Sequence, residues 1–343
     1  MKIWKVFIIM VLALALVFSF AACGDIGSEE NEANTAEPRV LRFALQSTVD
    51  SMPTVSAEEA AARIEELSGG TLQIDVYPAQ QLGDYTTVYD ELMLGTIDMA
   101  VISVVDSYDP RLAAGFLPYI ASGYDELREV MAPENFLCTT MSELEAAQNI
   151  KFFGFYCEGF CGVISNDPLE NANVSNADKG RLIRVPPSDT WNFAFQRLGF
   201  DTATIPYSDA YSALQTGLVD GFTGGPAYGI YDGFRDVCKY LYCYDAVCEN
   251  LQTLMSLDVW NSLTEEQQAA VTQGLEELCA QSIDEAEENE TIHREKLVEA
   301  GIEVIEFTDE ERAAMAEDVR TNVWGQLEET FTSEFLDALA ASY

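Results

Sequence analysis

Short apolar segments alternate with helix-like segments near the start of the chain, and this alternation restricts the fold more than any other feature. Three segments have the length and apolar character of strands: residues 40–45, 72–76 and 97–105. A Ser56–Glu59 capping box predicts a helix that ends at Leu67, and a second helix is expected over residues 86–94. This order predicts an α/β fold whose mostly parallel sheet is covered by helices on both faces.

The same alternation begins again after residue 150. Strands are expected over residues 152–156, 182–185 and 219–222. Helices are expected over residues 191–198 and 209–216, each followed by a glycine that favours helix termination. The two halves are not sequence repeats, but they predict two α/β lobes.

A single long helix is expected near the carboxyl end. Its capping box begins at Thr264, and the helical pattern continues to about Ala300. A helix of this length can span two lobes, and a cleft between lobes is a favoured site for a small molecule. We therefore expect two lobes with an interlobe cleft. The expected lobes are lobe I, residues 39–158 plus 250–290, and lobe II, residues 159–249 plus 291–343.

The amino terminus predicts export from the cytoplasm. Lys2 and Lys5 precede an uncharged run over residues 6–20, and Ala21-Ala22 stand directly before Cys23. This arrangement indicates a signal peptide over residues 1–22, and it resembles a bacterial lipoprotein signal in which Cys23 becomes lipid-modified. Cleavage of an ordinary secretory signal near Ala22 is the alternative. Residues 23–38 are polar and acidic, and we expect a flexible tether that holds the folded body near a membrane.

The formal net charge of −40 limits the partners of the chain. Such a charge argues against nucleic acid or an anionic lipid surface as a partner. An anionic ligand would therefore need a local cationic or amide-lined site.

The sequence leaves open which cysteines are free thiols and which form disulfides. Once Cys23 is set aside, seven remain, and an odd number leaves at least one thiol unpaired. Buried free thiols and one or two disulfides are both open, including a Cys157–Cys161 bridge. The spacing of Cys238, Cys243 and Cys248 does not match a zinc site.

No motif of catalysis stands out. His293 is the single histidine, and it lies among charged residues of the expected long helix, where a solvated side chain is expected. No glycine-rich phosphate loop with a strand–loop–helix context is present. The acidic run over residues 284–290 lacks the spacing of a calcium loop. We therefore expect neither an enzyme nor a cofactor or metal requirement.

Two long stretches resemble a known family. Residues 58–84 (EEAAARIEELSGGTLQIDVYPAQQLGD), followed by ELMLGTIDMAVIS, are similar to the amino-terminal half of solute-binding proteins of tripartite ATP-independent periplasmic (TRAP) transporters, the DctP family. Residues 178–222 (DKGRLIRVPPSDTWNFAFQRLGFDTATIPYSDAYSALQTGLVDGF) resemble its central signature. The resemblance covers about residues 40–335. It implies an extracytoplasmic, non-enzymatic binding protein with a two-lobed, periplasmic-binding-protein-like fold. Such a protein delivers a small organic acid to integral membrane permease subunits driven by an ion gradient.

The resemblance also implies a carboxylate-binding arginine. Arg184 occupies the family's "IRVP" position, where the guanidinium forms a two-pronged salt bridge with the ligand. A guanidinium suits this role because its donor fork matches a carboxylate and its charge survives burial. Pairing with an acid of the protein itself is the alternative for Arg184. Tyr207 falls where the family places an aromatic residue against the ligand, with packing at a lobe surface as its alternative.

Other residues are weaker candidates for ligand contact. Trp191 and Phe222 are aromatic residues near strand ends, where filling the core is the alternative role. Cys161 stands where many members have a second arginine, and Gly224-Gly225 stand where an acid and an asparagine are common before the proline. These departures disfavour sialic acid and simple C4-dicarboxylates, and they favour a monocarboxylate with an apolar or aromatic body.

Two polar residues of the first lobe complete the expected site. Ser103 and Gln46 follow first-lobe strands, and we expect both to reach the cleft. A different role for the whole protein also stays open. A binding protein of this kind can present its ligand to a membrane receptor kinase and so act as a sensor rather than serve transport.

Overall fold

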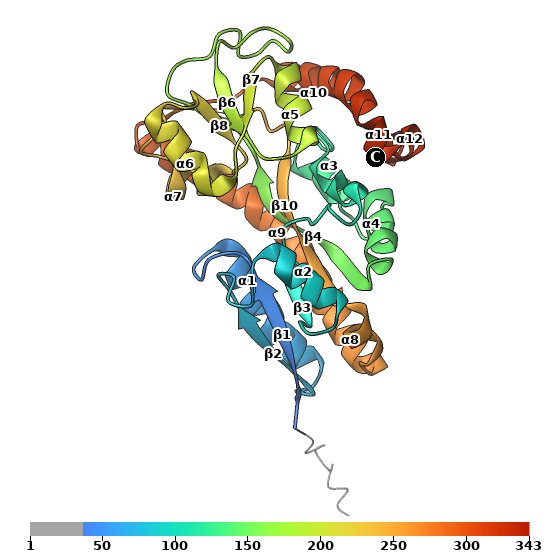
Figure 1. Ribbon diagram of the computed structural model, residues 1–343. Coiled ribbons are helices and arrows are strands. Elements are labelled where there is room, and N and C mark those ends of the chain that lie inside the picture. Colours follow the sequence, from blue (N-terminus) through green and yellow to red (C-terminus); the bar gives the residue numbers. More distant parts are fainter. Residues whose placement is uncertain (1–36, 343) are drawn as a thin grey trace, which may run out of the picture. The chain divides into compact units, whose positions relative to one another are not determined.

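The computed structural model describes residues 37–342 (Figure 1). The predicted signal peptide, Cys23 and nearly all of the predicted tether lie outside these residues. The chain from Pro38 onward forms one compact unit that contains two β-sheets with helices packed against them. Within residues 37–342, no helix combines the length and apolar character needed to cross a membrane.

The first sheet has five strands in the order β2-β1-β3-β10-β4. Its strands are β1 (Arg39–Leu45), β2 (Leu72–Tyr77), β3 (Met99–Ile102), β4 (Ile150–Phe160) and β10 (Cys248–Ser256). Strand β1 is parallel to β2 and β3, whereas β10 is antiparallel to both β3 and β4. The parallel part follows the predicted strand–helix alternation. Strand β10 was not predicted, because it is buried along nearly its whole length and shows no polar alternation.

Six helices belong to this part of the chain. They are α1 (Met52–Leu67), α2 (Tyr85–Met93), η1 (Pro110–Phe116), α3 (Tyr124–Val130), α4 (Phe136–Ala146) and α8 (Leu257–Asn261). The predicted start of the first helix at Ser56 is wrong. The helix begins at Met52 with Pro53 in its first turn, where proline is well tolerated. The Ser56 hydroxyl donates to the Met52 carbonyl oxygen at 2.9 Å instead of capping the helix.

The second sheet has six strands in the order β11-β9-β5-β8-β6-β7. Its strands are β5 (Val163–Ser165), β6 (Leu182–Val185), β7 (Asp201–Thr204), β8 (Gly221–Thr223), β9 (Tyr240–Tyr242) and β11 (Glu303–Ile305). Three helices follow its strands: α5 (Asp189–Leu198), α6 (Tyr207–Thr216) and α7 (Ala227–Gly233). The chain passes between the two sheets at the short connections from β4 to β5 and from β9 to β10.

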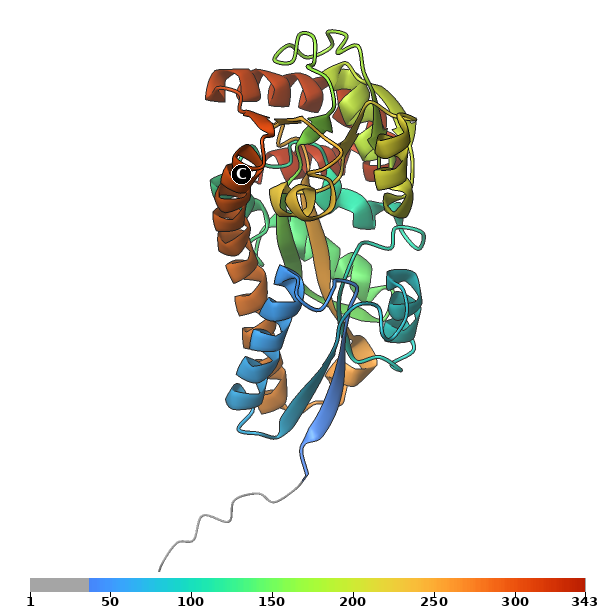
Figure 2. The ribbon, with the colours of Figure 1, turned by 90° about the vertical axis from the view of Figure 1, so that its left-hand side faces the viewer.

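The predicted long helix is confirmed as α9 (Glu265–Glu299), and its capping box between Thr264 and Gln267 is formed. It packs against α1 and β4 of the first sheet and also against α7 and β11 of the second (Figure 2). The chain ends in α10 (Asp309–Val323), η2 (Trp324–Leu327), α11 (Glu328–Phe331) and α12 (Ser333–Ala340). These last elements contact α5 of the second sheet and η1 and α4 beside the first.

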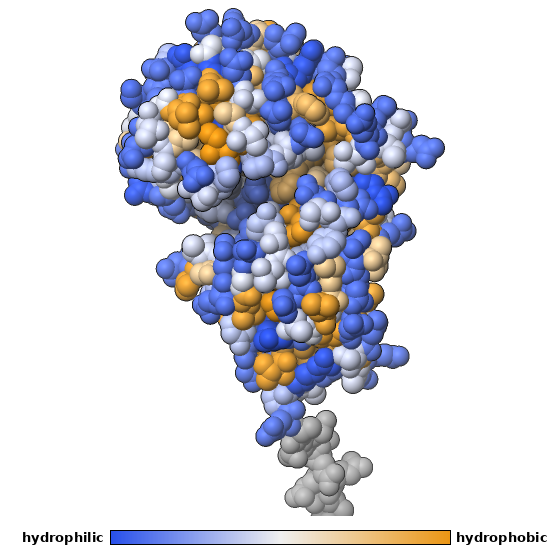
Figure 3. Space-filling view, viewed as in Figure 1, coloured by the Kyte–Doolittle hydropathy of each residue, from blue (hydrophilic) through white to orange (hydrophobic). Residues whose placement is uncertain are grey.

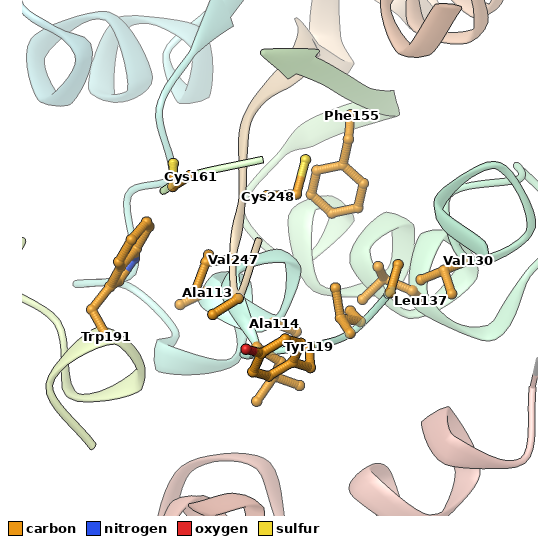
Figure 4. Packing of buried hydrophobic residues seen from close by; sticks show 14 of the residues in the cluster. Ala113, Ala114, Tyr119, Val130, Leu137, Phe155, Cys161, Trp191, Val247 and Cys248 are labelled. Carbon is orange, nitrogen blue, oxygen red and sulfur yellow. The ribbon is translucent and has the colours of Figure 1, made fainter. Parts of the chain in front are cut away.

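The cysteines of the body lie within the core. All seven between Cys138 and Cys279 are buried and free, so a Cys157–Cys161 bridge is not formed. The Sγ of Cys157 lies 3.4 Å from the Sγ of Cys248 instead, across the β4–β10 pair. Figure 4 shows Cys161 and Cys248 among the apolar side chains of the largest core cluster.

One buried acid makes the stability of the body depend on pH. Glu145 on α4 is completely buried, and its Oε2 accepts a hydrogen bond from the Tyr89 hydroxyl at 2.7 Å. Burial raises the pKa of the Glu145 carboxyl to about 7. The folded protein therefore holds this proton more tightly than the unfolded chain does. Its stabilising contribution is complete below about pH 4.5 and is lost as the pH rises through 7.

We predict that Glu145→Gln raises the stability of the protein at pH 8 and leaves it nearly unchanged at pH 5. Removal of the buried charge should recover up to about 3 kcal/mol at the higher pH. Thermal unfolding of the wild type and the variant at both pH values measures the difference. An equal effect at pH 5 and pH 8 would contradict the assignment.

Candidate functional site

Arg184 lies in the second sheet, at the third position of β6. Strand β6 is flanked by β7 and β8, and Arg184 is opposite Ala203 and Phe222 in the two ladders. The strand ends at the following residue because Pro186 offers no N–H for a ladder hydrogen bond. The arginine side chain therefore projects near the carboxyl ends of parallel strands, where α/β sheets commonly bind ligands.

The guanidinium of Arg184 is buried and only partly satisfied. Its side chain is 2% exposed. Nε donates to the Ile205 carbonyl oxygen at 2.7 Å, and Nη1 donates to the Thr223 carbonyl oxygen at 2.9 Å. Within residues 37–342, Nη2 has no hydrogen-bond partner, and it is not among the unpartnered atoms that are sealed from solvent. One edge of the donor fork is thus held by the backbone while Nη2 stays available.

Arg184 has no ion-pair partner in the part of the chain that the structure describes, since no carboxylate oxygen lies within 4.0 Å of it. This excludes pairing with an acid of the protein as its role in this structure. Burial lowers the pKa of Arg184 to about 10, and the group remains a cation at neutral pH. Lys179 offers a contrast, because its buried ammonium donates to the Val174 and Ala177 carbonyl oxygens of its own loop.

Two aromatic rings, those of Phe222 and Tyr207, lie on one side of the Arg184 guanidinium. The guanidinium carbon lies 5.1 Å from the Phe222 ring centroid and 5.8 Å from that of Tyr207, within cation–π range. Phe222 is fully buried and stacks on Phe234 at 4.4 Å. Tyr207, the first residue of α6, is 56% exposed. Tyr207 therefore presents a ring to open space, whereas Phe222 lies beneath it as support.

Gly224 lets the chain pass close to the guanidinium. Its φ of +110° is a conformation that side chains with a Cβ rarely adopt. A Cβ at this position would lie 2.7 Å from Nη1 of Arg184. The glycine therefore keeps the arginine in its position.

Two glutamates that the sequence analysis missed lie beside this arginine. In the β4–β10 ladder, Glu249 is opposite Gly159 and Asn250 is opposite Cys157, so Glu158 is the extra residue of a β-bulge. Bulges commonly redirect side chains next to functional sites. Oε1 of Glu158 accepts a hydrogen bond from the Tyr228 hydroxyl at 2.6 Å. Residues 246–256 mix apolar and polar side chains without a regular pattern, so no local signal in the sequence identified Glu249.

The electrostatics tie these acids to the arginine. Burial, followed by the charge of Glu158, raises the pKa of Glu249 to about 8, and the charge of Arg184 opposes this rise. Burial also raises the pKa of Glu158. Glu249 in turn raises the pKa of Arg184 against the effect of burial. Arg184, Glu249 and Glu158 thus belong to one electrostatic group.

The other predicted residues lie in two places. Trp191 stacks on Phe195 with ring centroids 5.9 Å apart, and both Trp191 and Cys161 are buried in the largest core cluster (Figure 4). Gln46 and Ser103 follow the adjacent strands β1 and β3, and the Gln46 side-chain oxygen accepts from the Ser103 N–H at 2.8 Å. The structure brings Gln46 and Ser103 together, but no recorded contact joins either of them to Arg184.

The surface is hollowed beside helices α6 and α7. Figure 3 shows a hollow between the part that carries α6 and α7 and the part that carries α1 and α2. Helices α6 and α7 carry Tyr207 and Tyr228. A separate cavity of about 330 Å³ lies between the start of α5 and α11, where Asp189 and Phe331 are among its lining residues. None of the predicted ligand residues lines that cavity.

The described residues do not form a metal centre. Between residues 37 and 342, no three His, Cys, Asp or Glu side chains are arranged to hold a metal ion. Nδ1 of His293 lies 2.8 Å from the Asn289 carbonyl oxygen of its own helix. A buried cation, a free donor and an aromatic wall beside a hollow are features of a binding site.

Two sheets joined by crossing strands, with a buried arginine whose donor fork is only partly used at strand ends, are consistent with a two-lobed solute-binding protein. The family model of bacterial extracellular solute-binding proteins, family 7 (DctP), matches residues 46–330. The chain belongs to this family of TRAP-type binding proteins. Members of this family act outside the cytoplasm, where they bind solutes for transport, and they are not enzymes.

Individual relatives agree with this assignment. The C4-dicarboxylate-binding periplasmic protein DctP of Rhodobacter capsulatus is 28% identical over 316 residues, which are 90% of this chain and 92% of the relative. A TRAP periplasmic solute-binding protein from Ochrobactrum anthropi has the same fold, with a TM-score of 0.79, 22% identity and coverage of 89% and 95% of the two chains. The sugar-acid-binding protein from Advenella mimigardefordensis, solved with galactonate, gives a TM-score of 0.74, 20% identity and coverage of 90% and 99%.

We predict that Gly224→Ala destabilises the protein more than Gly217→Ala does. Both glycines have positive φ, but a Cβ at Gly217 meets nothing within 4 Å, whereas one at Gly224 meets the guanidinium. The control variant, Gly217→Ala, should lower the free energy of unfolding by about 1 kcal/mol through backbone strain. Gly224→Ala should lower it by up to about 3 kcal/mol. Denaturant unfolding measures both values. Equal losses of unfolding free energy in the two variants would contradict this prediction, because they would mean that the guanidinium moves aside at no energetic cost.

Proposed function

We propose that this protein captures a small organic acid through Arg184. The observation that carries the proposal is a buried guanidinium whose Nε and Nη1 each donate to one backbone carbonyl oxygen and whose Nη2 has no partner among residues 37–342. The second N–H of Nη1 and an N–H of Nη2 can donate to the two oxygens of a carboxylate. The arginine is held in place by the strand ends, so little side-chain entropy is lost on binding.

The ligand that best suits this site is a monocarboxylate with an apolar or hydroxylated body. Among the described residues, Arg184 is the cation that acts on Glu249, and a second ligand carboxylate would meet Glu158 and Glu249. Tyr207 provides a flat wall and a hydroxyl for the rest of the ligand. Galactonate, bound by the Advenella mimigardefordensis protein, is itself a monocarboxylate that carries several hydroxyl groups.

The remaining candidate residues have supporting roles in this proposal. Phe222, Trp191 and Cys161 are buried, and we assign them to the packing behind Arg184 and Tyr207. Gly224 gives the guanidinium its room. Gln46 and Ser103 are partly exposed at strand ends of the first sheet, and they would meet the ligand from the opposite lobe when the cleft closes.

When the ligand binds, the two lobes would move towards each other about the strands that cross between them. The proposed lobes are residues 39–158 plus 250–290 and residues 159–249 plus 291–343. The closed protein would then deliver its ligand to the TRAP permease subunits in the membrane. Membership of the DctP family supports transport, and it gives no support to the alternative of a sensor for a receptor kinase.

We predict that one class of monocarboxylates stabilises the protein and that Arg184→Ala abolishes this response. A ligand at 100 times its dissociation constant should add about 2.7 kcal/mol, which shifts the melting temperature by several degrees at most. A thermal-shift screen against organic acids measures this, with Arg235→Ala as the control because Arg235 is exposed and lies over Tyr231. A variant at Arg184 that responds like the wild type would refute the assignment.

We further propose that Cys23 carries a lipid that anchors the protein to the outer face of the cell membrane. The support is the position of Cys23 directly after Ala21-Ala22 at the end of an uncharged run. A stable anchor requires more than one acyl chain, which a diacylated and further acylated cysteine would supply. Residues 24–38 would then act as the tether between the membrane and the folded body.

We predict that Cys23→Ser moves the protein from the detergent phase to the aqueous phase in a phase-partition assay. Cys238→Ser is the control, since it also removes one thiol but leaves the amino terminus unchanged. The wild type and the control should stay in the detergent phase. If the wild type is found in the aqueous phase, the protein is an ordinary secreted product without a lipid.

A further inference from the structure

The acidic side of the site has no role in binding a carboxylate. Glu249 and Glu158 lie on the two crossing strands, β10 and β4, which connect the two sheets. Over residues 37–342, the carboxylate of Glu249 makes no hydrogen bond or ion pair. Glu158 uses one oxygen to accept from Tyr228 and leaves the other without a partner. None of these three free oxygens is among the atoms sealed from solvent, so they line open space.

A bulge and a glycine direct these acids into the site. Glu158 is the extra residue of the β4 bulge, and Gly159 next to it has a φ of +121°. A Cβ at Gly159 would lie 3.2 Å from Cβ of Pro226, at the start of the α7 segment that carries Tyr228. The local backbone is therefore arranged so that Glu158 reaches Tyr228 while Glu249 lies across the ladder.

Arg184 is an independent sign that a ligand binds here. It is nine-tenths buried, its Nη2 has no partner among the described residues, and it interacts electrostatically with Glu249. The backbone at Gly224 adjoins the guanidinium, and Pro226, two residues later, adjoins Gly159 beside Glu158, so the free cationic donor and the free carboxyl oxygens lie near one another. A site dedicated to a simple acid would need the cationic donor but not the carboxyl acceptors.

The charges of the site favour one class of ligand. When Glu249 gives up its proton and Glu158 is ionised, Arg184 and the two acids sum to one negative charge, a state that a simple carboxylate disfavours and a ligand ammonium group stabilises. A ligand that also bears an ammonium group adds no net charge, and its N–H donors match the free carboxylate oxygens. Building on the proposed function, we infer that the ligand is an amine-bearing carboxylate, an amino acid or related zwitterion, whose carboxylate binds Arg184 and whose ammonium group binds Glu249 and Glu158.

The test uses matched acids that differ only in one group. The probes are 4-aminobutanoate, 4-hydroxybutanoate and butanoate, together with phenylalanine, phenyllactate and 3-phenylpropanoate. Calorimetric titration of the purified protein measures each dissociation constant. In at least one set, the amine-bearing member should bind about tenfold or more tightly than its hydroxy counterpart, as expected for hydrogen bonds to charged groups.

Two variants assign the preference to the acids. Glu249→Gln should remove most of the preference for the amine, and Tyr228→Phe, which frees Glu158, should reduce it. Glu317→Gln is the matched control, because it removes one charge from an exposed position of α10. Thermal unfolding verifies that each variant is folded, and Tyr228→Phe keeps the test valid if Glu249→Gln does not fold.

The number of protons released or taken up on binding is a second measurement. Its sign should differ between amine-bearing acids and simple carboxylates. The pKa of Glu249 is about 8, and Glu158, Arg184, Tyr207, Tyr228 and Cys161 are the titratable groups that interact with it. An ammonium group lowers the pKa of Glu249, so binding near pH 7.5 should release protons. A simple carboxylate raises that pKa, so its binding should take protons up. Titrations in phosphate and in Tris, which differ in ionisation heat, determine the sign.

The outcomes separate this inference from the proposed function. The inference is overturned if no amine-bearing acid binds more tightly than its hydroxy counterpart, or if binding of the amine takes protons up. In that case, hydroxy or unsubstituted acids that bind through Arg184 would leave the proposed function standing. If Arg184→Ala changes the affinity of none of the probes, the proposed function fails as well.

Discussion

The site depends on one constraint, which is that a guanidinium must be buried without an acid to neutralise it. Burial of an unpaired charge is costly, and the protein offsets the cost with carbonyl oxygens rather than a carboxylate. Ile205 and Thr223 supply these oxygens from the segments next to β6, at the end where the parallel strands finish. The register of the second sheet thus fixes the arginine and leaves part of its donor fork for a ligand.

The crossing strands have the complementary role. Strands β4 and β10 are the longest pairing in the body and connect its two sheets, and the bulge at Glu158 interrupts their ladder beside Arg184. An extra residue in one strand bends it and redirects a side chain. The same position therefore supplies both a change of direction between the lobes and two acids in the site. Any closure of the lobes would bring the first-sheet residues Gln46 and Ser103 towards this group.

The sequence predicted those features that have a local cause. The helix α9 was predicted because its capping box and helical pattern are continuous, whereas Arg184 was proposed as a ligand residue from the resemblance of its IRVP segment to the family. Strand β10 and Glu249 were missed because a strand buried on both faces gives no alternation. The bulge at Glu158 and its contact with Tyr228 depend on the pairing of distant strands, which no local pattern encodes.

The most direct measurement is a crystal structure of the protein with the acid that binds it most tightly. The carboxylate oxygens should lie about 3 Å from Nη1 and Nη2 of Arg184, with Tyr207 against the body of the ligand. The lobes should be closer together than in the structure described above. A ligand bound elsewhere, such as in the cavity beside Asp189 and Phe331, with Arg184 unoccupied, would contradict the assignment of the site.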